Sequence, residues 1–162
     1  MKTQSIVVII SIQLVLISYV TAQNWITLGL SLSFQAPKTS FRYTQSVNIR
    51  DGLDLWINKV NNVQGGSVIG NQTFLYRTKI LEDYGNITIV MQNYYALLND
   101  TEVNFLLGPI NSDFSNPVAA ITEKAKRIII ATSAGSDLFF QGRRYAFSVV
   151  VPASRSVTLC SY

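Results

Sequence analysis

Two short polar segments of this chain carry residue types that could bind a small molecule. Segment 108–117 reads Gly-Pro-Ile-Asn-Ser-Asp-Phe-Ser-Asn-Pro, and segment 132–137 reads Thr-Ser-Ala-Gly-Ser-Asp. Their hydroxyl, amide and carboxylate groups, together with open backbone, suit a ligand with several hydrogen-bonding groups. Each segment follows a short apolar run, residues 104–107 and 127–131, so both are expected at the ends of buried strands.

The chain lacks the side chains that most enzymes use for proton transfer or nucleophilic attack. It contains no histidine, no G-x-S-x-G elbow, no P-loop and no G-x-G-x-x-G turn. Glu82 and Asp83 are adjacent carboxylates, but such neighbours point to opposite faces of a strand and more often cap the following turn. We therefore predict no catalytic residue, no metal site and no cofactor. A hydrolase that takes catalytic residues from further chain is the enzyme alternative.

The first residues have the composition of a secretory signal. Lys2 precedes an apolar run at residues 6–20, and small residues end at Ala22, so we predict a signal peptide over 1–22. An uncleaved signal anchor is the alternative. Without Lys2 the chain has 12 basic and 9 acidic side chains, a net charge of +3. These charges are scattered, so nucleic acid is not an expected partner.

Three Asn-x-Thr sequons predict N-glycosylation at Asn71, Asn86 and Asn99. Together with the signal segment, they predict a secreted protein or one on the outer face of the plasma membrane. Cys160 is the single cysteine, so no internal disulfide can form. In an oxidising compartment such a thiol suggests an absent partner or a missing stretch of chain, although a harmless free thiol is the alternative.

The hydrophobic pattern predicts an α/β fold with a doubly wound, mostly parallel sheet. Strands and helices alternate along the chain, and right-handed crossovers restrict how they can be wound. With the common strand order 2-1-3-4-5, residues 33–43 lie next to 108–116, with 132–137 alongside. The expected strands are 26–34, 73–80, 104–107, 127–131 and 145–151, and the expected helices are 47–62, one capped by Asn86, 117–126 and one from 153.

Five stretches in this order resemble the first lobe of a type I periplasmic-binding-protein-like domain. The resemblance extends over residues 26–152 and is to branched-chain amino-acid binding proteins and to the ligand-binding regions of metabotropic glutamate and natriuretic peptide receptors. The stretches are Ile-Thr-Leu-Gly-Leu at 26–30, Arg-Asp-Gly-Leu-Asp-Leu-Trp-Ile-Asn at 50–58, Gly65-Gly66, Leu-Gly-Pro-Ile-Asn-Ser at 107–112 and Tyr-Ala-Phe at 145–147.

The resemblance implies a two-lobed clamshell that closes on a small, amino-acid-like ligand. It implies ligand contacts from Ser112 after the third strand and from Thr132, Ser133 and Ala134 after the fourth. The related amino-acid binders commonly have a threonine where this chain has Ala134. Asp113 is also placed at the site, where its charge would repel a ligand carboxylate, so a neutral or cationic ligand is the alternative. Helix capping is the other role open to Asp113.

The resemblance also implies a domain organisation. Residues 23–162 would form a partial receptor ligand-binding region, the N-terminal lobe of a truncated clamshell whose second lobe is missing. The expected function is extracellular small-molecule binding in a receptor or solute-binding protein, with a membrane-anchored signalling domain as a further partner. The alternative is a one-lobe interaction module that forms a homodimer without a small ligand, using a helix face near Tyr94 and Tyr95.

Overall fold

The computed structural model describes residues 23–156, so the expected signal peptide and Cys160 lie outside the described residues. Strands and helices alternate as the sequence pattern predicts. The elements are β1 (Asn24–Leu32), α2 (Phe41–Asn58), the π-helix η1 (Lys59–Val63), β2 (Ser67–Ile69), β3 (Gln72–Glu82), α3 (Ile87–Asn99), β4 (Val103–Leu107), α4 (Ser112–Lys124), β5 (Ile129–Ala131), α5 (Asp137–Phe140), β6 (Ala146–Ser148) and α6 (Ala153–Ser156).

The described strands form one mostly parallel sheet. Its order is β2-β3-β1-β4-β5-β6, and only β2 runs antiparallel to its neighbour. Leaving β2 aside, this is the expected order 2-1-3-4-5, which is confirmed. The sequence pattern missed β2 because three residues are too few to show strand periodicity, and Gly70 forms the tight turn into β3 with a φ of +61°.

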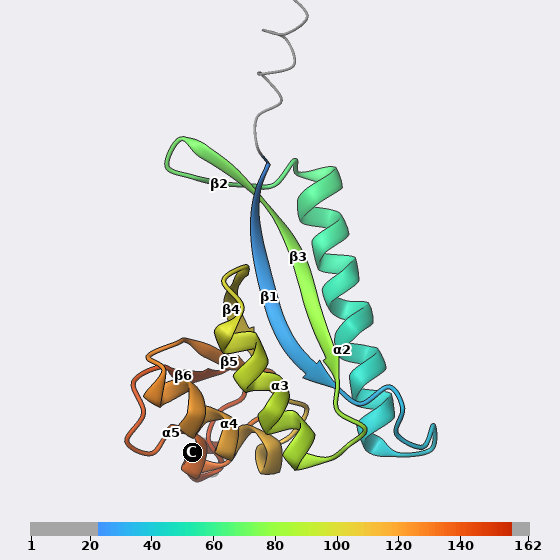
Figure 1. The fold of residues 1–162 in the computed structure, drawn as a ribbon, viewed down its shortest axis with the longest axis vertical. Coiled ribbons are helices and arrows are strands. Elements are labelled where there is room, and N and C mark those ends of the chain that lie inside the picture. Colours follow the sequence, from blue (N-terminus) through green and yellow to red (C-terminus); the bar gives the residue numbers. More distant parts are fainter. Residues whose placement is uncertain (1–22, 157–162) are drawn as a thin grey trace, which may run out of the picture.

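The helices lie on both sides of the sheet. Figure 1 shows α2 on one side of the β1–β3 pair and α3 with α4 on the other. Gly29 marks the α3 side, because a Cβ there would stand 3.1 Å from Leu97 of α3. Since strand side chains alternate, Leu28, Leu30 and Leu32 point to the α2 side. Two faces of the same strand therefore bury against different helices.

Tyr94 is the largest fully buried side chain in the core between the sheet and α3. Its hydroxyl donates a hydrogen bond to the carbonyl of Leu107 at the end of β4. Burial raises the pKa of the Tyr94 hydroxyl far above its usual value. The group thus stays a neutral donor, while the neighbouring Tyr95 is exposed.

Helix starts differ from the sequence expectation in two places. The helix expected over 117–126 begins at Ser112, because Asn111 caps it by accepting a hydrogen bond from the Phe114 N–H at 3.0 Å. Pro117 therefore lies inside α4, so the second half of segment 108–117 is helix and the prediction of a loop there was wrong. The helix expected over 47–62 begins at Phe41, while the predicted cap of α3 by Asn86 is confirmed.

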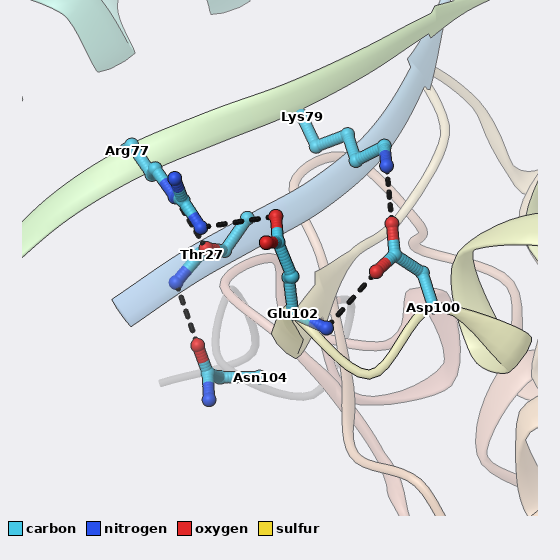
Figure 2. A network of polar contacts seen from close by, with 6 residues as sticks. All are labelled: Thr27, Arg77, Lys79, Asp100, Glu102 and Asn104. Atoms are coloured by element: carbon cyan, nitrogen blue, oxygen red, sulfur yellow. Dashed lines mark hydrogen bonds and ion pairs between the residues drawn. The ribbon is translucent and has the colours of Figure 1, made fainter. Parts of the chain in front are cut away.

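A polar network fixes the α3–β4 turn to the sheet (Figure 2). Arg77 donates to the Thr27 hydroxyl at 2.9 Å and pairs with Glu102 at 3.1 Å. Lys79 pairs with Asp100, and this contact lowers the pKa of the Asp100 carboxyl below its usual value. Arg77, Glu102 and Lys79 have exposed side chains and Asp100 is partly covered, so each pair contributes little to stability and the network mainly orients the turn.

Candidate ligand-binding site

The carboxyl ends of β4 and β5 lie unusually close together. A Cβ on Gly108, directly after β4, would stand 2.7 Å from the Ala131 Cα at the end of β5. Only glycine allows this approach without moving backbone. The two polar segments identified in the sequence therefore start side by side, at the sheet edge where open parallel sheets bind ligands.

The amino end of α4 forms one wall of this site. Asn111 is the cap, Ser112 is half-buried in the first turn, and Asp113 beside it is exposed. The first N–H groups of a helix have no partner within it and favour negative charge. Asp113 is therefore not the cap, but its carboxylate lies in the first turn, where it interacts favourably with the helix dipole.

The segment after β5 forms the other wall. The Ser133 hydroxyl donates a 2.5 Å hydrogen bond to the Ile110 carbonyl and so joins the two loops. Ala134 is fully buried in the core, and its carbonyl accepts a hydrogen bond from the Ser148 hydroxyl at 3.0 Å. Thr132 is half-buried. The structure thus brings Ser112, Ser133 and Thr132 to one edge, but it places the Ala134 side chain away from solvent.

Two buried polar atoms near this edge lack a hydrogen-bond partner. Among the described residues, none bonds to Thr132 Oγ1 or to Asn116 Oδ1, although both atoms are buried. Buried polar groups are nearly always paired, since an unpaired one costs about 1–3 kcal/mol. A partner from outside the protein, such as a ligand, would satisfy Thr132. Asn116 lies in the polar segment 108–117 but was not singled out as a site residue from the sequence.

The carboxyl ends of β1 and β3 are organised differently, around the buried carboxylate of Asp83. This carboxylate accepts hydrogen bonds from the Ser31 hydroxyl at 2.9 Å, from the Ser33 hydroxyl, and from the Gly85 N–H at 2.8 Å. Asn93 of α3 in turn donates to the Ser31 hydroxyl at 3.0 Å. All these groups bind one another, so this half of the edge is structural.

Glu82 also holds loops together at this edge, on its more exposed side. Its carboxylate accepts from the backbone N–H groups of Phe34, Gln35 and Tyr84 at 2.9, 3.2 and 2.8 Å. It therefore holds the loop after β1 against the turn after β3. Both carboxylates of the adjacent pair accept hydrogen bonds from the loop and turn at this edge, which agrees with the turn-capping interpretation.

Arg42 connects the two halves of the edge and was not among the expected site residues. Its guanidinium lies 4.9 Å from the centre of the Phe114 ring in α4 and donates to the Gly85 carbonyl at 3.2 Å. These contacts confirm that residues 33–43 lie beside 108–116. A lone arginine in the first turn of a helix has no sequence signature, so only the fold could reveal its position.

Within residues 23–156, no group of three or more acidic, histidine or cysteine side chains is arranged to hold a metal ion. In the same part of the chain, no helix combines the length and apolar character needed to span a bilayer.

No known protein-family profile matches the chain, whereas solved structures share its fold. An ABC transporter substrate-binding protein from Desulfitobacterium hafniense matches with a TM-score of 0.68 and 18% identity, over 85% of this chain and 37% of that one. The branched-chain amino acid substrate-binding protein LivJ of Streptococcus pneumoniae, solved with isoleucine, matches with a TM-score of 0.64 and 18% identity, over 80% and 34%. A Rhodopseudomonas palustris solute-binding protein, solved with 3,4-dihydroxybenzoic acid, matches with a TM-score of 0.62 and 14% identity, over 79% of this chain and 32% of that one.

These similarities establish the fold. The described part of the chain has the architecture of one lobe of a type I periplasmic binding protein, as the sequence resemblance implied. The chain spans about a third of the length of the structures it matches. Sequence identities this low support a shared fold, but they do not support a shared ligand.

Proposed function

We propose that this chain is an extracellular binding domain for a small, amino-acid-like molecule and belongs to a receptor or solute-binding protein. The solved structures of the same fold support this, since they are solute-binding proteins, two of them solved with leucine and isoleucine. The residues proposed to contact the ligand are Ser112, Asp113, Thr132, Ser133 and Ala134.

The unpaired hydroxyl of Thr132 is the observation that carries this proposal. It is buried beside the loop that joins β4 to the amino end of α4, and it needs a partner. Ser112, the first residue of α4, offers a hydroxyl and an N–H at the same edge of the sheet. The exposed carboxylate of Asp113 disfavours a ligand carboxylate directly beside it and favours a neutral or cationic group.

The proposed domain organisation is that of an extracellular clamshell. Residues 1–22 serve as the signal peptide, residues 23–162 as the first lobe, and a second lobe completes the clamshell. Asn71, Asn86 and Asn99 are all exposed and are proposed to carry N-glycans. Asn86 caps α3 through Oδ1, which leaves Nδ2, the atom that carries a glycan, outside the cap bond.

A matched pair of threonine variants tests ligand binding. Leucine, isoleucine, 3,4-dihydroxybenzoate and lysine are titrated into isotope-labelled protein, and amide shifts are followed by NMR. We expect at least one probe to shift amides in 108–113 and 132–136, and Thr132→Val to weaken that binding about 2- to 10-fold through loss of one hydrogen bond. Thr78→Val, a half-buried threonine in β3, is the control and should bind like the parent.

Two outcomes would count against the proposal. Shifts confined to other parts of the chain would place the ligand elsewhere. No shift with any of the four probes at their solubility limits would remove the support for an amino-acid-like ligand.

A helix-face interaction module is the second candidate function. A groove of about 370 Å³ runs between α3 and α4, lined in part by Tyr95, Leu98 and Ile121. Tyr95 is 53% exposed there, so its ring is open to a partner. The Asn86 sequon at the start of α3 counts against a tight interface on this face, because a glycan would crowd it.

A further inference from the structure

The groove between α3 and α4 contains one of the three sequon asparagines. Its lining includes Asn99, the last residue of α3, and Tyr95, one helical turn earlier. The other two sequon asparagines lie elsewhere: Asn71 is at the turn between β2 and β3, and Asn86 is at the opposite end of α3. A sugar on Asn99 would therefore begin inside the groove.

The geometry of a helix directs the Asn99 side chain toward Tyr95. Residues four apart lie one above the other on a helix face, and each Cα–Cβ bond tilts toward the amino end of the helix. Asn99 thus leans back along α3 instead of off its end. Its side chain is exposed, and no residue within 23–156 hydrogen-bonds to its amide. The Nδ2 atom is free to carry a sugar.

The groove has the size and the chemical groups to hold a sugar ring. Its volume of about 370 Å³ lies within the range of about 300–1,000 Å³ that is typical of small-molecule sites. The face of an aromatic ring carries partial negative charge, so the exposed Tyr95 ring can pack against sugar C–H groups. Leu98 and Ile121 add apolar surface. Lys124 has no ion-pair partner in the described part of the chain and can donate to sugar oxygens.

The rest of the sequon is held in place by the network of Figure 2. Asp100 pairs with Lys79 and accepts a hydrogen bond from the Glu102 N–H at 2.9 Å. Thr101, the third residue of the sequon, is exposed. The anchored turn fixes Asn99 relative to the groove, so a glycan that packs there orders only itself and loses less entropy than one on a mobile loop.

We propose that an N-glycan on Asn99 folds back into the α3–α4 groove and that its first N-acetylglucosamine packs against Tyr95. The inference rests on the proposed N-glycosylation of Asn99 and gives that glycan a structural role. It also names the occupant of the groove, because the chain's own sugar would close this face to a protein partner. The ligand site at the carboxyl edge of the sheet is not involved.

Thermal melting of the secreted glycoprotein tests the contact. The full chain is made in eukaryotic secretory cells, and mass spectrometry of glycopeptides measures the occupancy of Asn99. We expect Asn99→Gln to lower Tm by about 2–4 °C, but by less than about 1 °C when Tyr95→Ala is already present. Endoglycosidase trimming to one N-acetylglucosamine should preserve the parent Tm. Asn71→Gln is the control, and its effect should be the same with and without Tyr95→Ala.

A second measurement needs no substitution at Tyr95. In the trimmed protein, NMR should show nuclear Overhauser effects between the Tyr95 ring and the N-acetylglucosamine on Asn99. An unmodified Asn99 would overturn this inference together with the proposed glycosylation of that residue. A glycosylated Asn99 that shows no such effect, or the same Tm loss in both backgrounds, would overturn this inference alone and leave the groove to a protein partner.

Discussion

The two halves of the sheet's carboxyl edge contain similar polar residues but differ in whether their buried polar groups are hydrogen-bonded. At the carboxyl ends of β1 and β3, the buried Asp83 carboxylate accepts hydrogen bonds from Ser31, Ser33 and Gly85. At the carboxyl ends of β4 and β5, the buried hydroxyl of Thr132 has no hydrogen-bond partner among the described residues. Buried polar groups that are paired hold loops in place, whereas an unpaired one calls for an explanation, and here it supports the proposal that a ligand binds beside it. The comparison separates scaffold from candidate site without reference to any relative.

The largest expected effect comes from breaking the paired half with Asp83→Asn. The amide keeps the shape of the carboxylate but directs its NH₂ toward groups that now donate. We expect the free energy of unfolding to fall by about 3 kcal/mol, because hydrogen bonds to a charged group are lost and a buried donor is left unpaired. Urea denaturation measures this loss.

Asp113→Asn is the matched control on the other half of the edge. Its side chain is exposed, so the free energy of unfolding should change by less than about 0.5 kcal/mol. Equal losses in the two variants would show that the paired and unpaired halves do not differ as described.

A smaller effect is expected from Gly108→Ala, which tests the spacing of the two site loops. The new Cβ would stand 2.7 Å from backbone at Ala131, so β4 and β5 must separate at a cost of about 2 kcal/mol. Gly52→Ala in α2 meets nothing within 4 Å and should raise stability by about 0.5–1 kcal/mol. Thermal melting of both variants shows whether each substitution lowers or raises stability. A Gly108→Ala protein as stable as the parent would contradict the close approach of β4 and β5.

The smallest effect concerns the network of Figure 2, far from either half of the edge. Lys79 lowers the pKa of Asp100 in the folded chain, so Asp100 contributes stability that is present above its unfolded pKa and lost as pH falls through the folded value. Asp100→Asn should therefore lower the urea midpoint slightly at about pH 7, and the difference from the parent should shrink toward about pH 2. A difference that grows on acidification would contradict the assigned pairing.

Much of the fold could be predicted from residue patterns. Alternating apolar runs and helical periods led to the parallel sheet and its strand order, because crossovers are right-handed and loops are short. The start of α4 could not be predicted in this way. Pro117 is a strong start signal, but Asn111 caps the helix earlier, and two competing local signals cannot be ranked without the packing of Phe114 and Val118 in the core.

The candidate site was predicted in part. Both polar segments do meet at one edge, as strand order requires, and Ser112, Thr132 and Ser133 are among the residues there. Ala134 is there too, but with its side chain in the core. Arg42 and Asn116 lie in the segments expected at this edge but were not singled out as site residues, because their positions depend on where α2 and α4 begin. Ligand contacts, glycosylation and the signal peptide stay predictions.

Sequence by itself determined the order of the elements, the winding of the sheet and the location of the polar loops, because these follow from periodicity, turn residues and the handedness of the chain. Tertiary structure alone decided which polar groups are paired and which apolar groups are covered. Ser33 and Asp83, 50 positions apart, form a hydrogen bond, whereas Thr132 finds no partner among the described residues. Such differences depend on separations of an ångström or less between distant segments, and no local pattern encodes them.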